Sequence, residues 1–265
     1  MACALLGVTP MKMNSIHGCS LLALTVALSA AAACGGSTQG TRPHDMSVKS
    51  HETKAANEQT TASEHEAQYD PEAKKRTERC QGRNPKTGVD TCWTSVTNPT
   101  TEHLDHAEQH RKAAALHRAA AQALRDAENR ACVGVPDADR DESPFDHRED
   151  IESVEPLYVG PSGGKLSSKR LVGATVTFRA VPGMTAQWLQ RVVDCHLARN
   201  AALGHDVAEM AYCPLVPKGA SATVVANRSG FAVNIQSDTQ ESVQEILRRA
   251  QGLTQPSTRP SGATP

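Results

Sequence analysis

The chain has 265 residues, and its 28 Lys and Arg side chains against 29 Asp and Glu give a formal net charge of -1. This balance provides no long-range field that would attract a polyanion, so we expect no nucleic-acid partner. Aromatic residues make up only 3 % of the chain and hydrophobic residues 38 %, which predicts that much of it lies outside a packed core. Eight cysteines without a C-x-x-C spacing are typical of an oxidising compartment, where disulfides form.

The first 33 residues have the three regions of a signal peptide. Lys12 precedes an apolar run, and residues 29–33 are all small. The run Leu28-Ser29-Ala30-Ala31-Ala32-Ala33-Cys34 resembles a bacterial lipoprotein lipobox, with Ala31 at the position where the common pattern has Leu.

This resemblance implies cleavage before Cys34, acylation of its thiol and attachment to a membrane of the cell envelope. Gly35, rather than Asp, follows the cysteine and resembles the sorting pattern of the outer membrane, so we expect the mature chain to face the periplasm or the cell surface. An ordinary signal peptide and an uncleaved membrane anchor are the alternatives. The apolar run is short for a spanning helix, which favours lipidation.

Residues 34–98 are predominantly polar and predict a disordered tether, because they offer too little apolar surface to offset chain entropy. Within the tether, Cys80 and Cys92 bracket a polar loop that a local disulfide would close. Residues 99–135 predict one long helix, since the stretch from Thr101 to Cys132 is rich in good helix formers and contains neither Gly nor Pro. The apolar stripe expected on this helix consists of Ala113, Leu116, Ala120, Leu124, Ala127 and Ala131.

Residues 136–253 predict a small α+β domain with the element order β-α-β-β-α. Apolar residues alternate from Val172 to Ala180, as in a half-buried strand, and recur at helical spacing from Thr185 to Gly204. Two further alternating runs flank a tight turn at residues 227–230 and predict a hairpin, and a second amphipathic helix ends near Gly252. Residues 154–159 could add an edge strand, because Pro156 cannot donate to a central ladder. Residues 254–265 are expected to be a disordered tail.

Four histidines fall on one face of the long predicted helix. His103, His106, His110 and His117 are offset by 0, 3, 7 and 14 residues, which places them within roughly 60° of one another at about 100° per residue. Of these, His103, His106 and His110 could chelate a transition metal, the one cofactor that the sequence suggests. The alternative is a solvated polar face.

The remaining cysteines predict a second disulfide between Cys195 and Cys213, with Cys132 as the odd thiol. Cys195 and His196 are adjacent on a predicted helix and point about 100° apart, so they do not form a nucleophile and base pair. No other acid, base and nucleophile converge in the sequence, and we expect no enzyme.

The sequence therefore predicts a membrane-anchored extracytoplasmic lipoprotein with a non-catalytic interaction or structural role in the cell envelope, where an envelope protein could be its partner. The alternative is a periplasmic protein that binds a transition metal through its histidine-rich helix face.

Overall fold

The structure is a computed structural model that describes residues 40–160 and 169–255. The expected signal peptide, the expected acylation site Cys34 and nearly all of the expected C-terminal tail lie outside the described residues. The chain belongs to the α+β class, as predicted, with two separate sheets. No helix among the described residues has the length and apolar character needed to cross a bilayer.

The larger sheet has four antiparallel strands in the order β3-β4-β6-β5. These strands are β3 (Ile151–Val159), β4 (Arg170–Arg179), β5 (Ser221–Ala226) and β6 (Gly230–Gln236). β3 lies at one edge and carries Pro156, as the missing N–H of that residue requires. The predicted order of the domain is therefore confirmed, with β3 added at its start.

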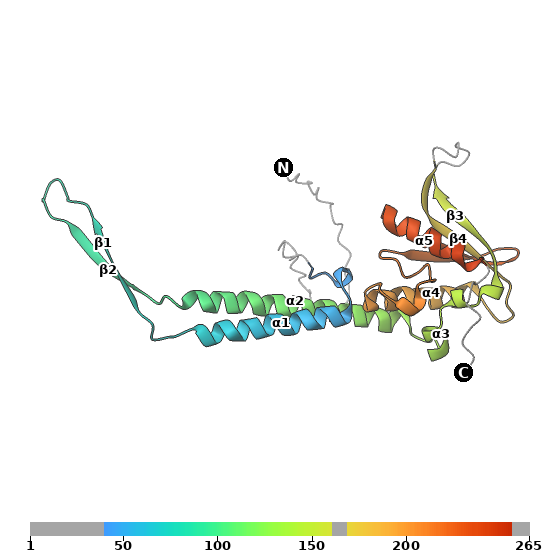
Figure 1. Ribbon diagram of the computed structural model, residues 1–265, viewed down its shortest axis with the longest axis horizontal. Coiled ribbons are helices and arrows are strands. Elements are labelled where there is room, and N and C mark those ends of the chain that lie inside the picture. Colours follow the sequence, from blue (N-terminus) through green and yellow to red (C-terminus); the bar gives the residue numbers. More distant parts are fainter. Residues whose placement is uncertain (1–39, 161–168, 256–265) are drawn as a thin grey trace, which may run out of the picture. The chain divides into compact units, whose positions relative to one another are not determined.

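Two helices cover one face of this sheet, α4 (Ala186–Leu203) and α5 (Gln240–Leu253) (Figure 1). Val176 of β4 and Val233 of β6 are register partners whose side chains are both fully buried, and Leu189 of α4 and Ile246 of α5 belong to the same core. On the other face, the Thr175 hydroxyl donates to Asn234 Oδ1 at 2.8 Å. One buried and one polar face explain why alternation was visible in the sequence.

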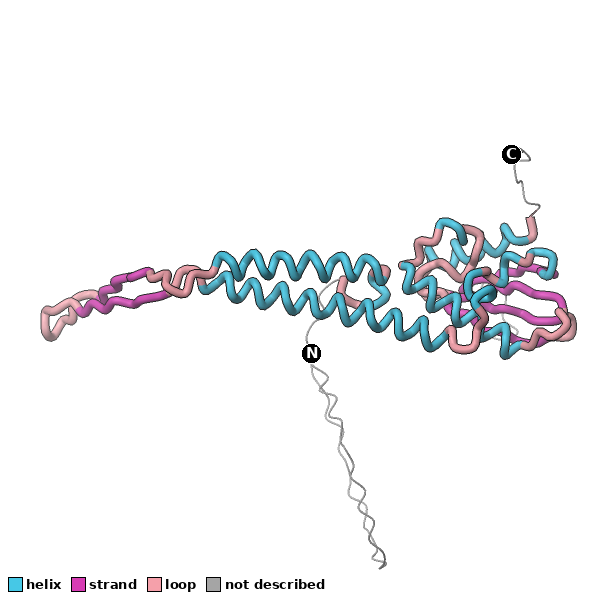
Figure 2. The backbone as a smooth tube through the Cα atoms, turned by 90° about the horizontal axis from the view of Figure 1, so that it is seen from below, coloured by secondary structure: helices cyan, strands magenta, loops and turns pink. Residues whose placement is uncertain are grey.

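The region expected to be a disordered tether contains a well-formed helix, and that prediction was wrong. Helix α1 (Val48–Gln68) begins after Ser47, whose hydroxyl accepts a hydrogen bond from the Ser50 N–H at 3.1 Å, and it ends before Asp70-Pro71. It packs along α2 (Thr101–Ala131), and the two helices lie side by side in both views (Figures 1 and 2). Composition suggested disorder because α1 buries no large apolar side chain of its own.

A two-stranded antiparallel hairpin joins α1 to α2 (Figure 1). Its strands are β1 (Lys75–Gln81) and β2 (Thr91–Thr97), and the predicted disulfide between Cys80 and Cys92 links them directly across the ladder. The base of the hairpin is tied by Asn98 Nδ2, which donates to the Asp70 carbonyl at 2.7 Å.

The predicted long helix is present as α2, and Ala120 and Leu124 of the expected stripe are buried, but the rest of the buried stripe differs from the expected one. Ala107, Ala114 and Ala121 are almost fully buried, whereas Leu116 is 45 % exposed. The stripe lies where α1 packs, which the sequence reading could not take into account because it treated α1 as disordered. Near its C-terminal end Leu124 packs against Ala201 and Ala202 of α4.

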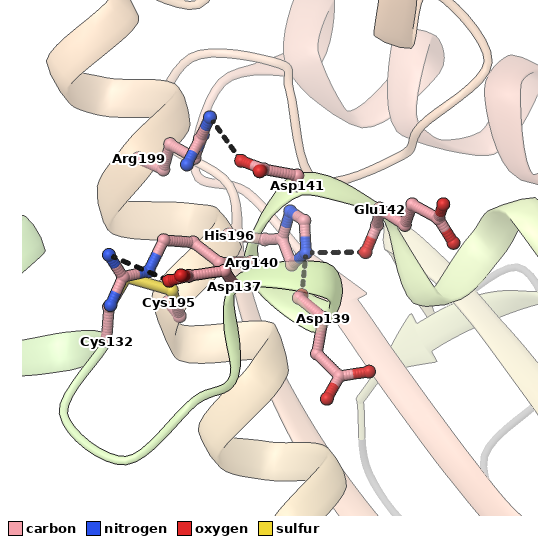
Figure 3. Close-up of a disulfide and its surroundings, with 9 residues drawn as sticks. All are labelled: Cys132, Asp137, Asp139, Arg140, Asp141, Glu142, Cys195, His196 and Arg199. Atoms are coloured by element: carbon pink, nitrogen blue, oxygen red, sulfur yellow. Dashed lines mark hydrogen bonds and ion pairs between the residues drawn. A yellow bond between two sulfur atoms is a disulfide. The ribbon is translucent and has the colours of Figure 1, made fainter.

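The second disulfide joins Cys132 to Cys195 (Figure 3). Cys213 is a free, fully buried thiol, so the predicted bond between Cys195 and Cys213 was wrong. The end of α2, not the loop that leaves α4, lies beside Cys195. Cys213 instead contacts the Ser143 hydroxyl at 3.3 Å and belongs to the core beneath the sheet.

Around this disulfide, α4 also holds the short helix α3 (Asp137–Asp141) (Figure 3). His196 Nε2 donates to the carbonyl oxygens of Asp139 and Glu142, both at 3.0 Å, and Arg199 pairs with Asp141 at 2.9 Å. The remaining described elements are the single 3-10 turns Pro43–Asp45, Pro144–Asp146, Arg148–Asp150 and Ala208–Met210.

Candidate metal centre

The contact between α1 and α2 follows a seven-residue repeat in which alanine alternates with larger polar residues. Alternating spacings of four and three residues mark the seam of a two-helix coiled coil. On α1 these positions are His51, Ala55, Glu58, Ala62 and His65. On α2 they are His103, Ala107, His110, Ala114, His117, Ala121 and Leu124. Because the alanines are small, the two backbones approach closely and the histidines of one helix meet those of the other.

The helices run antiparallel, so the end of α1 meets the beginning of α2. His65 therefore lies among three histidines of α2. Its ring centroid is 5.6 Å from that of His103, 5.2 Å from that of His106 and 5.5 Å from that of His110. Four imidazoles from two helices are gathered at one place on the seam.

The closest pair in this cluster has the spacing of two nitrogens on one metal ion. His65 Nδ1 and His103 Nδ1 are 3.3 Å apart, slightly beyond the usual hydrogen-bond range. Two nitrogens at 2.0 to 2.1 Å from a tetrahedral zinc ion are separated by about 3.4 Å. The pair could therefore hold one ion. Among the described residues no third ligand atom lies within 4.8 Å of both nitrogens, so a third ligand would require a side chain to move.

Glu58 orients the fourth histidine. His110 Nδ1 lies 2.7 Å from the Glu58 carboxylate, to which it donates a hydrogen bond. In the neutral ring this leaves Nε2 without a proton and free to act as a ligand. A carboxylate that fixes the tautomer of a histidine in this way is a common outer partner in metal sites.

The cluster also favours the neutral imidazole. The pKa of His65 is lowered from its usual value, first by desolvation and then by repulsion from His106, His110 and His103. Metal ions bind the neutral ring, so a lowered pKa reduces competition from protons.

A second histidine pair lies further along the seam and differs in character. His51 and His117 are both buried, and their Nδ1 atoms are 3.0 Å apart. Because His51 Nε2 lies 3.3 Å from the Pro43 carbonyl, it donates there, and His117 Nδ1 must then donate to the bare Nδ1 of His51. The two rings are thus joined by a hydrogen bond, and this pair is best explained as a structural contact.

Each of the three predicted metal ligands therefore lies against His65, whereas His117 lies against His51. The sequence reading missed His65 and Glu58 because both come from α1. Ala55 and Ala62 on one segment follow the same seven-residue repeat as Ala107, Ala114 and Ala121 on the other. This shared repeat is the signal that could have revealed His65 and Glu58.

Two places in the described chain bring three possible ligand atoms within 4.8 Å of one another, and neither includes the cluster around His65. One combines Glu78 with Cys80 and Cys92, whose sulfurs are committed to a disulfide. The other combines His147, Glu149 and Asp150, which offers only one nitrogen and is largely exposed. Neither has the number of nitrogen donors that the cluster around His65 provides.

No protein-family model, no curated protein and no solved structure matches this chain.

Proposed function

We propose that this chain is a lipid-anchored protein of the cell envelope that binds a transition-metal ion between α1 and α2. The observation that carries the proposal is the position of His65, which lies against His103, His106 and His110 of the neighbouring helix. Imidazole is a preferred ligand for zinc, copper and nickel, and four of them with a carboxylate behind one ring match the donor chemistry of these ions.

The envelope location is supported by the lipobox-like segment that ends at Cys34 and by the cysteine pairs 80–92 and 132–195, because disulfides persist in oxidising compartments. A second candidate function is a non-catalytic interaction or structural role toward an envelope partner. The hairpin of β1 and β2 favours it, since nearly every one of its side chains is exposed.

Calorimetric titration of the purified protein with Zn²⁺, Ni²⁺ and Cu²⁺ tests the metal proposal. We expect one ion per chain for at least one of these metals, and we expect His65→Ala and His106→Ala each to weaken it at least about tenfold. His147→Ala is the matched control and should leave the affinity unchanged, because it removes a histidine from the competing exposed group. Loss of binding in His147→Ala but not in His65→Ala would refute the site.

The anchor is tested separately by Cys34→Ser. This variant should leave the membrane fraction at high salt and lose incorporation of a labelled fatty acid, while retaining the metal affinity of the parent. A variant that stays membrane-bound, with no label in the parent, would contradict lipidation without bearing on the metal site.

A further inference from the structure

The hairpin that joins α1 to α2 has almost no core. Its strands pair only with each other, and between residues 74 and 97 every side chain except Thr77 and Ser95 is exposed. An isolated two-stranded hairpin is at best marginally stable in water. The disulfide between Cys80 and Cys92 therefore maintains a shape that packing does not supply.

The hairpin concentrates positive charge that the balance of the whole chain conceals. Between residues 75 and 97 the cations are Lys75, Arg76, Arg79, Arg83 and Lys86, and the only acids are Glu78 and Asp90. No ion pair within the described residues involves any of these five cations. The segment thus carries a local charge of +3 in a chain whose net charge is -1.

One face of the ribbon combines this charge with an exposed aromatic ring. Trp93 is 49 % exposed and lies directly opposite Arg79 in the ladder. Because side chains alternate along a strand, Lys75 shares that face with them, and neither strand places an acid there. Val96 on the other face and Val89 in the connecting loop are 57 % and 61 % exposed.

We propose that this hairpin docks on an anionic phospholipid surface. Lys and Arg are attracted to anionic headgroups, and an indole ring resides preferentially at the interface between headgroups and acyl chains. A soluble polyanion would account for the cations, but it would leave Trp93 and the loop residue Val89 in water. The combination of cations with exposed apolar side chains on a ribbon that buries nothing else favours a lipid surface.

This contact is independent of the acyl anchor and of the metal site. Each cation near an anionic surface contributes roughly a fivefold gain in partitioning, so the five together could dock the hairpin reversibly. A lipid-anchored chain would then touch a membrane at two points, one of them sensitive to salt.

Fluorescence of Trp93 tests the proposal in the full chain, because the chain contains only one other tryptophan, Trp188, which packs against the core. With vesicles of phosphatidylcholine containing one quarter phosphatidylglycerol, we expect Trp93 emission to shift to the blue and to be quenched by brominated acyl chains. Trp93→Phe should abolish the quenching, while Trp188→Phe should preserve it. This readout reports on the hairpin even if Cys34 is acylated.

The charge requirement is tested by the double variant Arg79→Gln with Arg83→Gln. This variant should need an about 25-fold higher lipid concentration for half of the full signal, about fivefold for each cation removed. The matched control is Arg130→Gln with Arg228→Gln, which removes the same charge from two exposed, unpaired positions outside the hairpin and should have no effect. Equal quenching with pure phosphatidylcholine vesicles, or none with either, would overturn the proposal. Binding to heparin that depends on Arg79 and Arg83 without quenching by the vesicles would identify a soluble polyanion instead and would also overturn it.

Discussion

At the scale of single residues, the sheet depends on Gly173 because β4 and β6 approach too closely there for a side chain. A Cβ atom on Gly173 would lie 1.9 Å from the carbonyl oxygen of Ile235, a backbone atom fixed in the ladder between the two strands. Relief would require the strands to separate, which breaks hydrogen bonds that the buried backbone cannot replace.

We therefore expect Gly173→Ala to lower the free energy of unfolding by at least about 2 kcal/mol, the range of overpacked cores. Gly252→Ala is the matched control, since a Cβ at Gly252 in α5 meets no atom within 4 Å and alanine favours a helix by roughly 1 kcal/mol. Denaturant unfolding monitored by Trp188 fluorescence measures both. Similar midpoints for the two variants would show that the strands can separate at this point without cost.

At the scale of elements, the sequence predicts best what is encoded locally. β4, α4, the β5 and β6 hairpin and α5 were all foreseen, because a covered sheet face and an amphipathic helix each leave a periodic apolar pattern. α1 was missed because its buried residues are His51, Ala55 and Ala62, which carry little hydrophobic signal. The histidine cluster was only partly foreseen for the same reason, since His65 and Glu58 belong to the missed helix.

The histidine pair in the seam between α1 and α2 should make this helix pair sensitive to acid. The pKa of His117 is lowered from its usual value, first by desolvation and then by repulsion from His51. As the pH falls through about 6.5, the unfolded chain therefore binds more protons than the folded chain. The free energy of unfolding decreases with acidification until the pH lies below the lowered pKa of His117 in the folded chain.

Denaturant unfolding followed by far-ultraviolet circular dichroism at pH 7.5 and pH 5 measures this effect. His117→Leu alone should destabilise the pair by about 1 to 3 kcal/mol at pH 7.5, because it leaves His51 Nδ1 buried without a donor. The double variant His51→Leu with His117→Leu replaces both partners and should regain that loss and show a weaker pH dependence. An unchanged pH dependence in the double variant would mean that other groups cause it.

At the scale of the whole molecule, α2 takes part in both halves of the fold. Its seam residues pack on α1, while Leu124 packs on α4 and Cys132, at its C-terminal cap, is bonded to Cys195 in the middle of α4. The sequence could not reveal this bond, because the choice of partner for Cys195 depends on how α2 packs on α4. Local patterns carry no information about that long-range contact.

The bond between Cys132 and Cys195 should therefore contribute to the stability of the sheet domain, whereas the bond in the hairpin should not. The first closes a loop with a sequence separation of 63 residues, which corresponds to about 4 kcal/mol in the chain-entropy model. The double variant Cys132→Ser with Cys195→Ser should accordingly lower the unfolding midpoint reported by Trp188. Cys80→Ser with Cys92→Ser is the matched control and should leave that midpoint unchanged, because the hairpin pairs with no other strand.

Peptide mapping without reductant should yield one disulfide-linked pair of fragments that contain Cys132 and Cys195. Because burial raises the pKa of Cys213, its thiol should be alkylated only after denaturation. A fragment that joins Cys195 to Cys213 would show that the structure has the wrong pairing.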